Sequence, residues 1–217
     1  MNLNEYIDHT NLAPDASEAD ILALCDEARK HGFAAVCVNP IWVRTAVNRL
    51  KGSDVAVCSV IGFPTGAHLP GTKVREARKA IAAGATEIDT VINIAALKAH
   101  DYNEVRADIE PLAILAHEHG AKLKVILETA LLTPDQIVHG CKWAEEFGAD
   151  YVKTSTGMLK GENSGATVPV VALMRANVKP ETGVKAAGGI RDRKTAEAMI
   201  EAGATRLGTS ASVDIAS

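Results

Sequence analysis

The sequence predicts an α/β protein, a single (β/α)8 TIM barrel with a short or missing final helix. The first observation is a recurring unit in which a helix ends at Gly-Ala or a similar pair and a short apolar strand follows, as at residues 84–90 and 148–154. The second is that eight such strands alternate with helices, which is typical of parallel βα units. The third is that no GxGxxG or Walker loop follows the first strand, which favours a closed barrel over an open doubly wound sheet.

The strands are expected wherever a short apolar run follows a turn signal. These runs are residues 6–10, 34–39, 55–61, 86–92, 122–129, 150–156, 182–187 and 205–210. Little sequence follows the last of them, which is why the final helix is expected to be a stub. No linker or change of composition divides the chain, so we expect one barrel domain over residues 1–217.

Local signals mark the helices between these strands. Ser17 with Asp20, and Thr133 with Gln136, have the spacing of capping boxes, which start helices by satisfying free backbone N–H groups. Pro111 lies inside the helical stretch between the fourth and fifth strands, where we expect a kink or a restart.

Composition excludes several classes of function. The chain has 217 residues, 47% hydrophobic and 23% charged, with a net charge of −4 and no basic run, which argues against a nucleic-acid partner. No apolar stretch approaches the roughly 18 residues of a membrane span, and the first ten residues lack a secretion signal, so a cytoplasmic location without membrane contact is expected. The four cysteines are far apart and no HExxH or acidic cluster appears, so we expect neither disulfide, metal nor cofactor.

Four residues hold the same offset from the glycine of the repeated unit. These are Cys37, Asp89, Lys153 and Gly208, on the second, fourth, sixth and eighth expected strands. Interior side chains of a barrel form layers drawn from alternate strands, so these four residues are expected to share a layer. Asp89 and Lys153 would then face each other.

The odd-numbered strands add further charged residues. Asp8, Lys124 and Lys185 lie within apolar strands, and Glu128 would share a face with Lys124 if that strand stays regular. Buried charges cost on the order of several kcal/mol each unless they are paired, so their convergence at one end of a barrel indicates a functional site.

Several lysines together suit carbonyl chemistry. An amine attacks a carbonyl only when it is unprotonated, and burial and neighbouring cations both favour the neutral form. Lys124 and Lys185 would supply those cations to Lys153, and Asp89 could shuttle protons. The seven histidines show no evident pairing in the sequence.

A phosphate-binding segment is also indicated. Gly188, Gly189 and Arg191 lead from the seventh strand into a helix, and Ser210 ends the eighth strand. Small residues at a helix N-terminus let backbone N–H groups approach an anion, and Gly157 would extend the same pocket.

These residues lie in segments that resemble the deoxyribose-phosphate aldolase family over nearly the whole chain. The matching segments are Tyr6–Leu12, Val36–Pro40, Val60–Gly66, Glu87–Asn93, Leu123–Thr129, Tyr151–Gly157, Val184–Arg191 and Leu207–Ser210. The resemblance implies a class I aldolase that reversibly cleaves 2-deoxy-D-ribose 5-phosphate to D-glyceraldehyde 3-phosphate and acetaldehyde, in deoxyribonucleoside and deoxyribonucleotide catabolism. Its partners would be these small molecules, and the protein would be a homodimer or homotetramer.

The same resemblance implies a role for each residue. Lys153 would form the Schiff base, Asp89 and Lys185 would relay protons, and Lys124 would support them. The remaining roles are contacts with the substrate and its phosphate: Asp8, Thr10 and Cys37 would bind the substrate, and Gly157, Gly188, Gly189, Arg191 and Ser210 the phosphate. The chain departs from the family pattern at Met158, where many relatives carry Phe or Lys, and in its short C-terminus.

Three alternatives remain open at this point. The first is a lysine-dependent aldolase acting on another phosphorylated or keto-acid donor. The second is a catalytically weak barrel that binds sugar phosphates as a sensor or scaffold. The third is a barrel carrying pyridoxal phosphate as a lysine imine, which lacks an obvious partner for the pyridine nitrogen.

Overall fold

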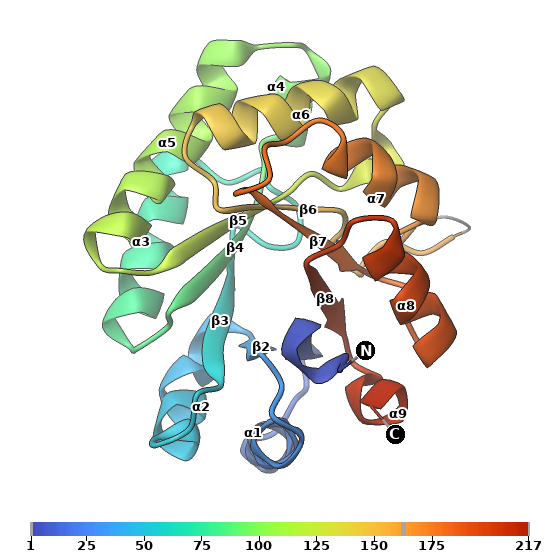
Figure 1. The fold of residues 1–217 in the computed structure, drawn as a ribbon. Helices are drawn as coiled ribbons and strands as arrows, with labels where there is room; N and C mark the ends of the chain where they lie inside the picture. The colour runs from blue at the N-terminus through green and yellow to red at the C-terminus, as the bar shows by residue number, and fades with distance from the viewer. Residues whose placement is uncertain (1, 162–163, 217) are drawn as a thin grey trace.

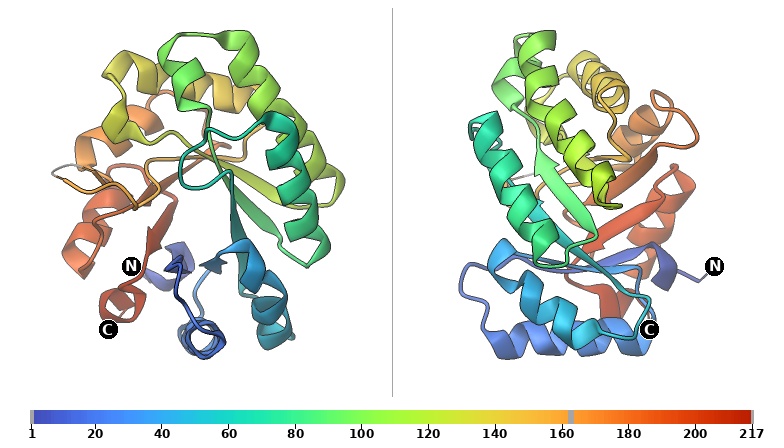
Figure 2. Two further views of the ribbon diagram at one scale, coloured as in Figure 1. Left: turned by 180° about the vertical axis from the view of Figure 1, so that it is seen from behind. Right: turned by 90° about the vertical axis from the view of Figure 1, so that its left-hand side faces the viewer.

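Eight parallel strands close into a barrel in the computed structural model, which describes residues 2–161 and 164–216. The strand order is β1 to β8 in sequence order, with β8 pairing back onto β1. Helices surround the strands on the outside (Figures 1 and 2). The predicted fold is therefore confirmed.

All the strands except β1, which is shifted by one residue, are shorter than the apolar runs that predicted them. They are β1 (Ile7–Asn11), β2 (Ala35–Val38), β3 (Ala56–Ile61), β4 (Glu87–Val91), β5 (Lys122–Ile126), β6 (Tyr151–Lys153), β7 (Gly183–Ala187) and β8 (Arg206–Thr209). The largest errors concern β5 and β6, predicted to reach residues 129 and 156. Beyond Ile126 and Lys153 the chain bends into loops at the mouth of the barrel, and apolar or threonine-rich composition alone does not reveal such a bend.

The helices fill the connections between these strands. They are α1 (Glu18–His31), α2 (Val43–Leu50), α3 (Pro70–Ala82), α4 (Ile94–Lys98), α5 (Tyr102–Glu118), α6 (Pro134–Glu146), α7 (Val168–Arg175), α8 (Arg193–Glu201) and α9 (Ser212–Ala216), with short 3-10 turns η1 (Asn4–Tyr6), η2 (Pro40–Trp42) and η3 (Thr129–Leu131). Both predicted capping boxes are present, at Ser17 before α1 and at Thr133 before α6.

Helix α5 runs through Pro111 without a restart, contrary to one of the two expected outcomes. A proline inside a helix costs about 3 kcal/mol because one backbone hydrogen bond is lost. Pro111 itself is exposed, but Ile109, Leu112 and Ala113 of the same helix are buried, so packing of the buried helix face offsets the loss.

The short helix α9 follows β8 and packs against α1 and β1, where Figure 1 shows both chain ends close together. A stub in place of a full final helix was predicted. Among the described residues, none of the helices is both long enough and apolar enough to cross a lipid bilayer.

The strands separate an apolar shell from a charged interior. Ile88, Val125, Val152 and Val184 belong to the large apolar core between strands and helices. Each is the sequence neighbour of a charged residue whose side chain points to the opposite face, because successive strand residues alternate. The barrel interior therefore receives the charged groups.

Candidate active site

Neighbouring strands deliver the predicted charged residues to one place inside the barrel. Asp89 on β4 is in register with Lys124 on β5, and Lys153 on β6 is in register with Lys185 on β7. Asp8 enters from β1, and the side chains of all five residues are buried. The expected convergence of charges is confirmed.

The carboxylate of Asp89 is the centre of this cluster. Its Oδ2 accepts hydrogen bonds from Lys153 Nζ at 2.7 Å and from Lys185 Nζ at 2.8 Å, and its Oδ1 accepts one from Lys124 Nζ at 2.8 Å. Burial alone would raise the pKa of Asp89, but the three lysines outweigh it and hold this pKa well below the usual range. Asp89 is therefore a carboxylate anion that accepts hydrogen bonds from three lysine Nζ atoms.

The two supporting lysines are held in their charged form. Burial would lower the pKa of Lys185, but Asp8 and Asp89 raise it above its usual value. Burial likewise opposes the charge on Lys124, whose pKa Asp89 nevertheless raises well above the usual range. Lys124 and Lys185 thus supply fixed positive charge beside Asp89.

A second layer of charges lies beneath, and part of it was not predicted. Arg206 Nη1 donates to Asp8 Oδ1 at 2.6 Å and to Glu87 Oε2 at 3.2 Å, while Lys124 Nζ lies 2.6 Å from Glu87 Oε2. Glu87 and Arg206 stand two residues before Asp89 and Gly208 on the same strands. Alternation along each strand was the signal that could have identified them.

Gly208 leaves room for Lys185. A Cβ at Gly208 would lie only 3.0 Å from Lys185 Cε, so a larger residue on β8 would crowd the lysine. The bond between Asp89 and Lys153 agrees with the predicted interior layer.

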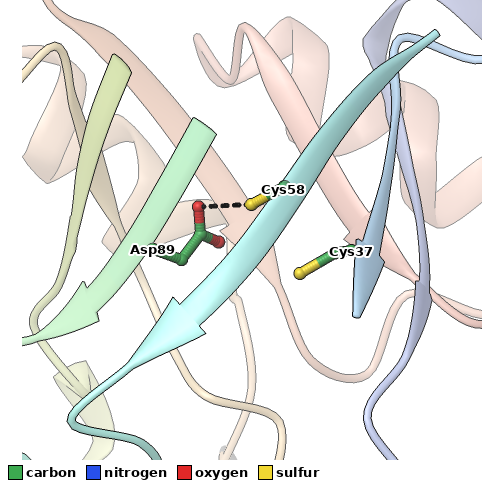
Figure 3. Close-up of side chains that lie close together, drawn as sticks. All are labelled: Cys37, Cys58 and Asp89. Atoms are coloured by element: carbon green, nitrogen blue, oxygen red, sulfur yellow. Dashed lines mark hydrogen bonds between the residues drawn. The ribbon is translucent and has the colours of Figure 1, made fainter. Parts of the chain in front are cut away.

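Two thiols complete the cluster on the side of β2 and β3 (Figure 3). Cys37 and Cys58 are register partners, and Cys58 Sγ donates to Asp89 Oδ1 at 3.1 Å. The neighbouring Cys58 thiol lowers the pKa of Cys37, whereas burial raises the pKa of Cys58. Cys58 was placed on a strand by the sequence but was not assigned to the site.

An open cavity of about 630 Å³ lies above this cluster. It is lined by Lys153 and by six of the predicted substrate and phosphate residues, Thr10, Gly157, Gly188, Gly189, Arg191 and Ser210. Among the described residues of the charged cluster, only Lys153 reaches its wall, with 3% of its surface exposed. Asp8 and Cys37 are fully buried and do not line it.

The glycines of the cavity wall have backbone conformations that favour glycine. Gly157, Gly188 and Gly189 have φ of 78°, 83° and 79°. Arg191 and Asp192 then lead into α8, where Asp192 caps the helix by accepting a hydrogen bond from Thr195 N. Backbone N–H groups of such a segment can bind an anion.

His9 is paired, contrary to expectation. Its Nε2 lies 2.7 Å from Glu27 Oε2 on α1, and its Nδ1 lies 2.8 Å from Ser212 Oγ on α9. The partners are 18 and 203 residues away in sequence, so no local pattern could have shown them. His9 joins the two helices nearest the chain ends.

Glu128 also differs from expectation, because β5 ends before it and its φ is 56°. The condition under which it would share a strand face with Lys124 is therefore not met. Its carboxylate accepts a hydrogen bond from Thr156 N at 3.2 Å, in the loop that follows Lys153.

Comparisons with known proteins identify aldolases as the proteins that this chain resembles. A family model described as DeoC/LacD family aldolase matches residues 4–214. Deoxyribose-phosphate aldolase of Brevibacillus brevis is 56% identical over 215 residues, covering 99% of this chain and 95% of the relative. The enzyme of that name from Thermococcus gammatolerans is 57% identical over 217 residues, with coverages of 99% and 95%.

A solved structure shares both the fold and the sequence pattern. Deoxyribose phosphate aldolase from Aeropyrum pernix, whose tetrameric structure is described as unique, matches with a TM-score of 0.90 and 34% identity. The match covers 99% of this chain and 89% of that one.

Proposed function

Because the chain belongs to the DeoC/LacD family of aldolases, we propose that its single barrel domain, residues 1–217, is a class I aldolase. The proposed reaction is the reversible cleavage of 2-deoxy-D-ribose 5-phosphate to D-glyceraldehyde 3-phosphate and acetaldehyde, in deoxyribonucleotide breakdown. One observation carries the mechanism: Lys153 lines the cavity while its Nζ lies 2.7 Å from Asp89 Oδ2.

The proposed covalent step begins at the Lys153 amine. After losing a proton, the amine adds to C1 of the open-chain sugar, and loss of water from the carbinolamine gives an iminium ion. The C2–C3 bond then breaks as the C3 hydroxyl loses its proton and becomes a carbonyl. The fragment C3–C5 leaves as D-glyceraldehyde 3-phosphate, and the electron pair moves into an enamine on Lys153. Protonation at C2 and hydrolysis release acetaldehyde and restore the amine.

Asp89 and Lys185 are proposed to move the protons. Asp89 is a carboxylate and Lys185 an ammonium, and they are joined by a 2.8 Å hydrogen bond within reach of Lys153. An anion that accepts beside a cation that donates suits carbinolamine dehydration and protonation at C2. Positioned acid–base groups typically contribute about 10²–10⁴-fold to the rate. Lys124 would support this pair by holding Asp89 ionised.

The substrate is proposed to lie along the cavity from Lys153 towards α8. Its phosphate would bind the backbone at Gly157, Gly188 and Gly189, with Arg191 and Ser210 beside it, and Thr10 would contact the hydroxyl groups. Asp8 and Cys37 lie behind this wall, so direct substrate contact by either stays a prediction.

Borohydride trapping with acetaldehyde, followed by peptide mass mapping, tests the central assignment. A two-carbon adduct on Lys153 is expected, lost in Lys153→Ala and much reduced in Lys185→Leu. An adduct on Lys185 or Lys124 instead would reverse the assigned roles. Cleavage rates on deoxyribose 5-phosphate and on keto-acid aldols, measured side by side, test the substrate class.

Self-association and a cytoplasmic location complete the proposal. The tetrameric relative from Aeropyrum pernix supports a homodimer or homotetramer, which light scattering during gel filtration would measure. Cys25, Cys37, Cys58 and Cys141 are free thiols, as suits a reducing compartment.

A further inference from the structure

Glu128 combines two unfavourable features. Its φ of 56° is in the left-handed region, which residues other than glycine and asparagine rarely adopt. Its side chain is also buried, with 2% of the residue exposed. Such strain persists only where the surrounding structure holds it in place, and it is concentrated at functional sites.

The backbone around Glu128 is tied to the strand that carries Lys153. Leu127 N donates to Lys153 O at 2.9 Å, and Thr129 N donates to Thr154 O at 2.9 Å. Glu128 lies between these two bonds, so its backbone has little freedom relative to β6. Its side chain is thereby directed at the loop that follows Lys153.

The carboxylate holds that loop at Thr156. It accepts Thr156 N at 3.2 and 3.3 Å through its two oxygens, and it also accepts the Thr156 hydroxyl. Thr156 Oγ1 in turn accepts Met158 N at 3.1 Å. Gly157 is thus enclosed by a chain of hydrogen bonds that begins at Glu128, and it lines the cavity.

The electrostatic environment agrees with an anchoring role. Burial raises the pKa of Glu128, although its hydrogen bonds to Thr156 and the nearby Lys153 act in the opposite direction. Glu128 makes no direct bond to Lys153 within the described residues, whereas Asp89 does. Its contacts therefore lead to the loop at Gly157.

We infer that Glu128 is a positioning residue that fixes residues 156–158 for the substrate phosphate, and so sets the preference for phosphorylated over free sugars. This inference rests on the proposed function for its substrate. A carboxylate is suited to the task because it accepts the N–H and the hydroxyl of Thr156 together. An amide at this position has only one acceptor oxygen, and its N–H group would face the N–H or hydroxyl donor of Thr156.

Glu145 provides a matched control. Its Oε1 accepts Lys179 N and the Thr182 hydroxyl, both at 2.7 Å, which is the same pair of donor types. These donors precede β7 and lie at the opposite end of the barrel from the cavity. Glu145→Gln therefore makes the same chemical change away from the phosphate.

The first test measures binding, independently of catalysis, with glycerol 3-phosphate, which has a phosphate but no carbonyl. Titration calorimetry should show about tenfold weaker binding in Glu128→Gln and in Thr156→Val, with no change in Glu145→Gln. The double variant Glu128→Gln/Thr156→Val should lose no more binding affinity than the weaker-binding single variant. Both substitutions remove the same interaction between Glu128 and Thr156. Equal binding by wild type and Glu128→Gln would overturn the inference.

The second test compares cleavage of 2-deoxyribose 5-phosphate with that of 2-deoxyribose. The ratio of the two kcat/KM values should fall about tenfold in Glu128→Gln through a higher KM for the phosphorylated sugar, and stay unchanged in Glu145→Gln. An equal loss on both sugars would refute the positioning role. A wild-type protein that cleaves neither sugar yet shows the expected binding pattern would refute the proposed function and leave this inference supported.

Discussion

Replacing Asp89 by Asn should destabilise the protein as well as inactivate it. Asp89 is fully buried and its carboxylate accepts hydrogen bonds from three lysine Nζ atoms within 2.8 Å. Asn keeps the shape, but it removes the negative charge and turns an N–H donor towards one of the lysines. The positive charges of Lys124 and Lys185 then lose their common partner.

The magnitude follows from the cost of an unpaired buried charge. Removing one partner of a buried ion pair typically costs about 3–5 kcal/mol. In a protein of this size each kcal/mol lowers the Tm by roughly 2–4 °C, so the Tm of Asp89→Asn should fall by about 6–20 °C. The surface pair of Asp26 and Arg49 offers the control, because Asp26→Asn removes a half-exposed carboxylate and should leave the Tm nearly unchanged.

Thermal unfolding followed by circular dichroism measures both variants, and the pH dependence adds a second check. The pKa of Asp89 is lowered in the folded state, so its stabilisation is present above the unfolded value of about 3.9 and is lost as pH falls below it. The stability gap between wild type and Asp89→Asn should therefore close in acid. A Tm for Asp89→Asn as high as that of Asp26→Asn would show that the three lysines do not need this anion.

Two other pairs give further predictions, one fully buried and one that joins the buried His9 to the half-exposed Glu27. Lys73 and Asp108 form a buried pair at 2.6 Å between α3 and α5, so Lys73→Met alone should cost about 3–5 kcal/mol in urea unfolding, while Lys73→Met/Asp108→Leu should recover most of the loss; equal losses in both variants would refute this account. Burial lowers the pKa of His9 although Glu27 opposes it, so wild type should lose the His9 contribution as pH falls below about 6.5. Urea unfolding of His9→Gln at pH 7.5 and 5.5 checks this, and a stability gap from wild type that does not narrow in acid would contradict it.

The local sequence determined the elements and the charged residues that they carry. The offset of Asp89 and Lys153 from their glycines places both on inward strand positions, because alternation along a strand is a short-range property. The capping boxes at Ser17 and Thr133 have the same origin, since each joins residues three apart.

The tertiary structure determined which charged residues pair with each other. It also determined where a residue adopts a conformation that its local sequence disfavours. Arg206 meets Asp8 and Glu87 only because the barrel closes, which brings together residues 198 and 119 apart in sequence. Packing carries α5 through Pro111 despite the lost hydrogen bond. Glu128 adopts a conformation that its residue type disfavours, because bonds to Lys153 at the end of β6 and to Thr154 just after it hold its neighbours. Contacts between residues far apart in the chain depend on barrel closure and strand register, and periodicity within one strand carries no information about either.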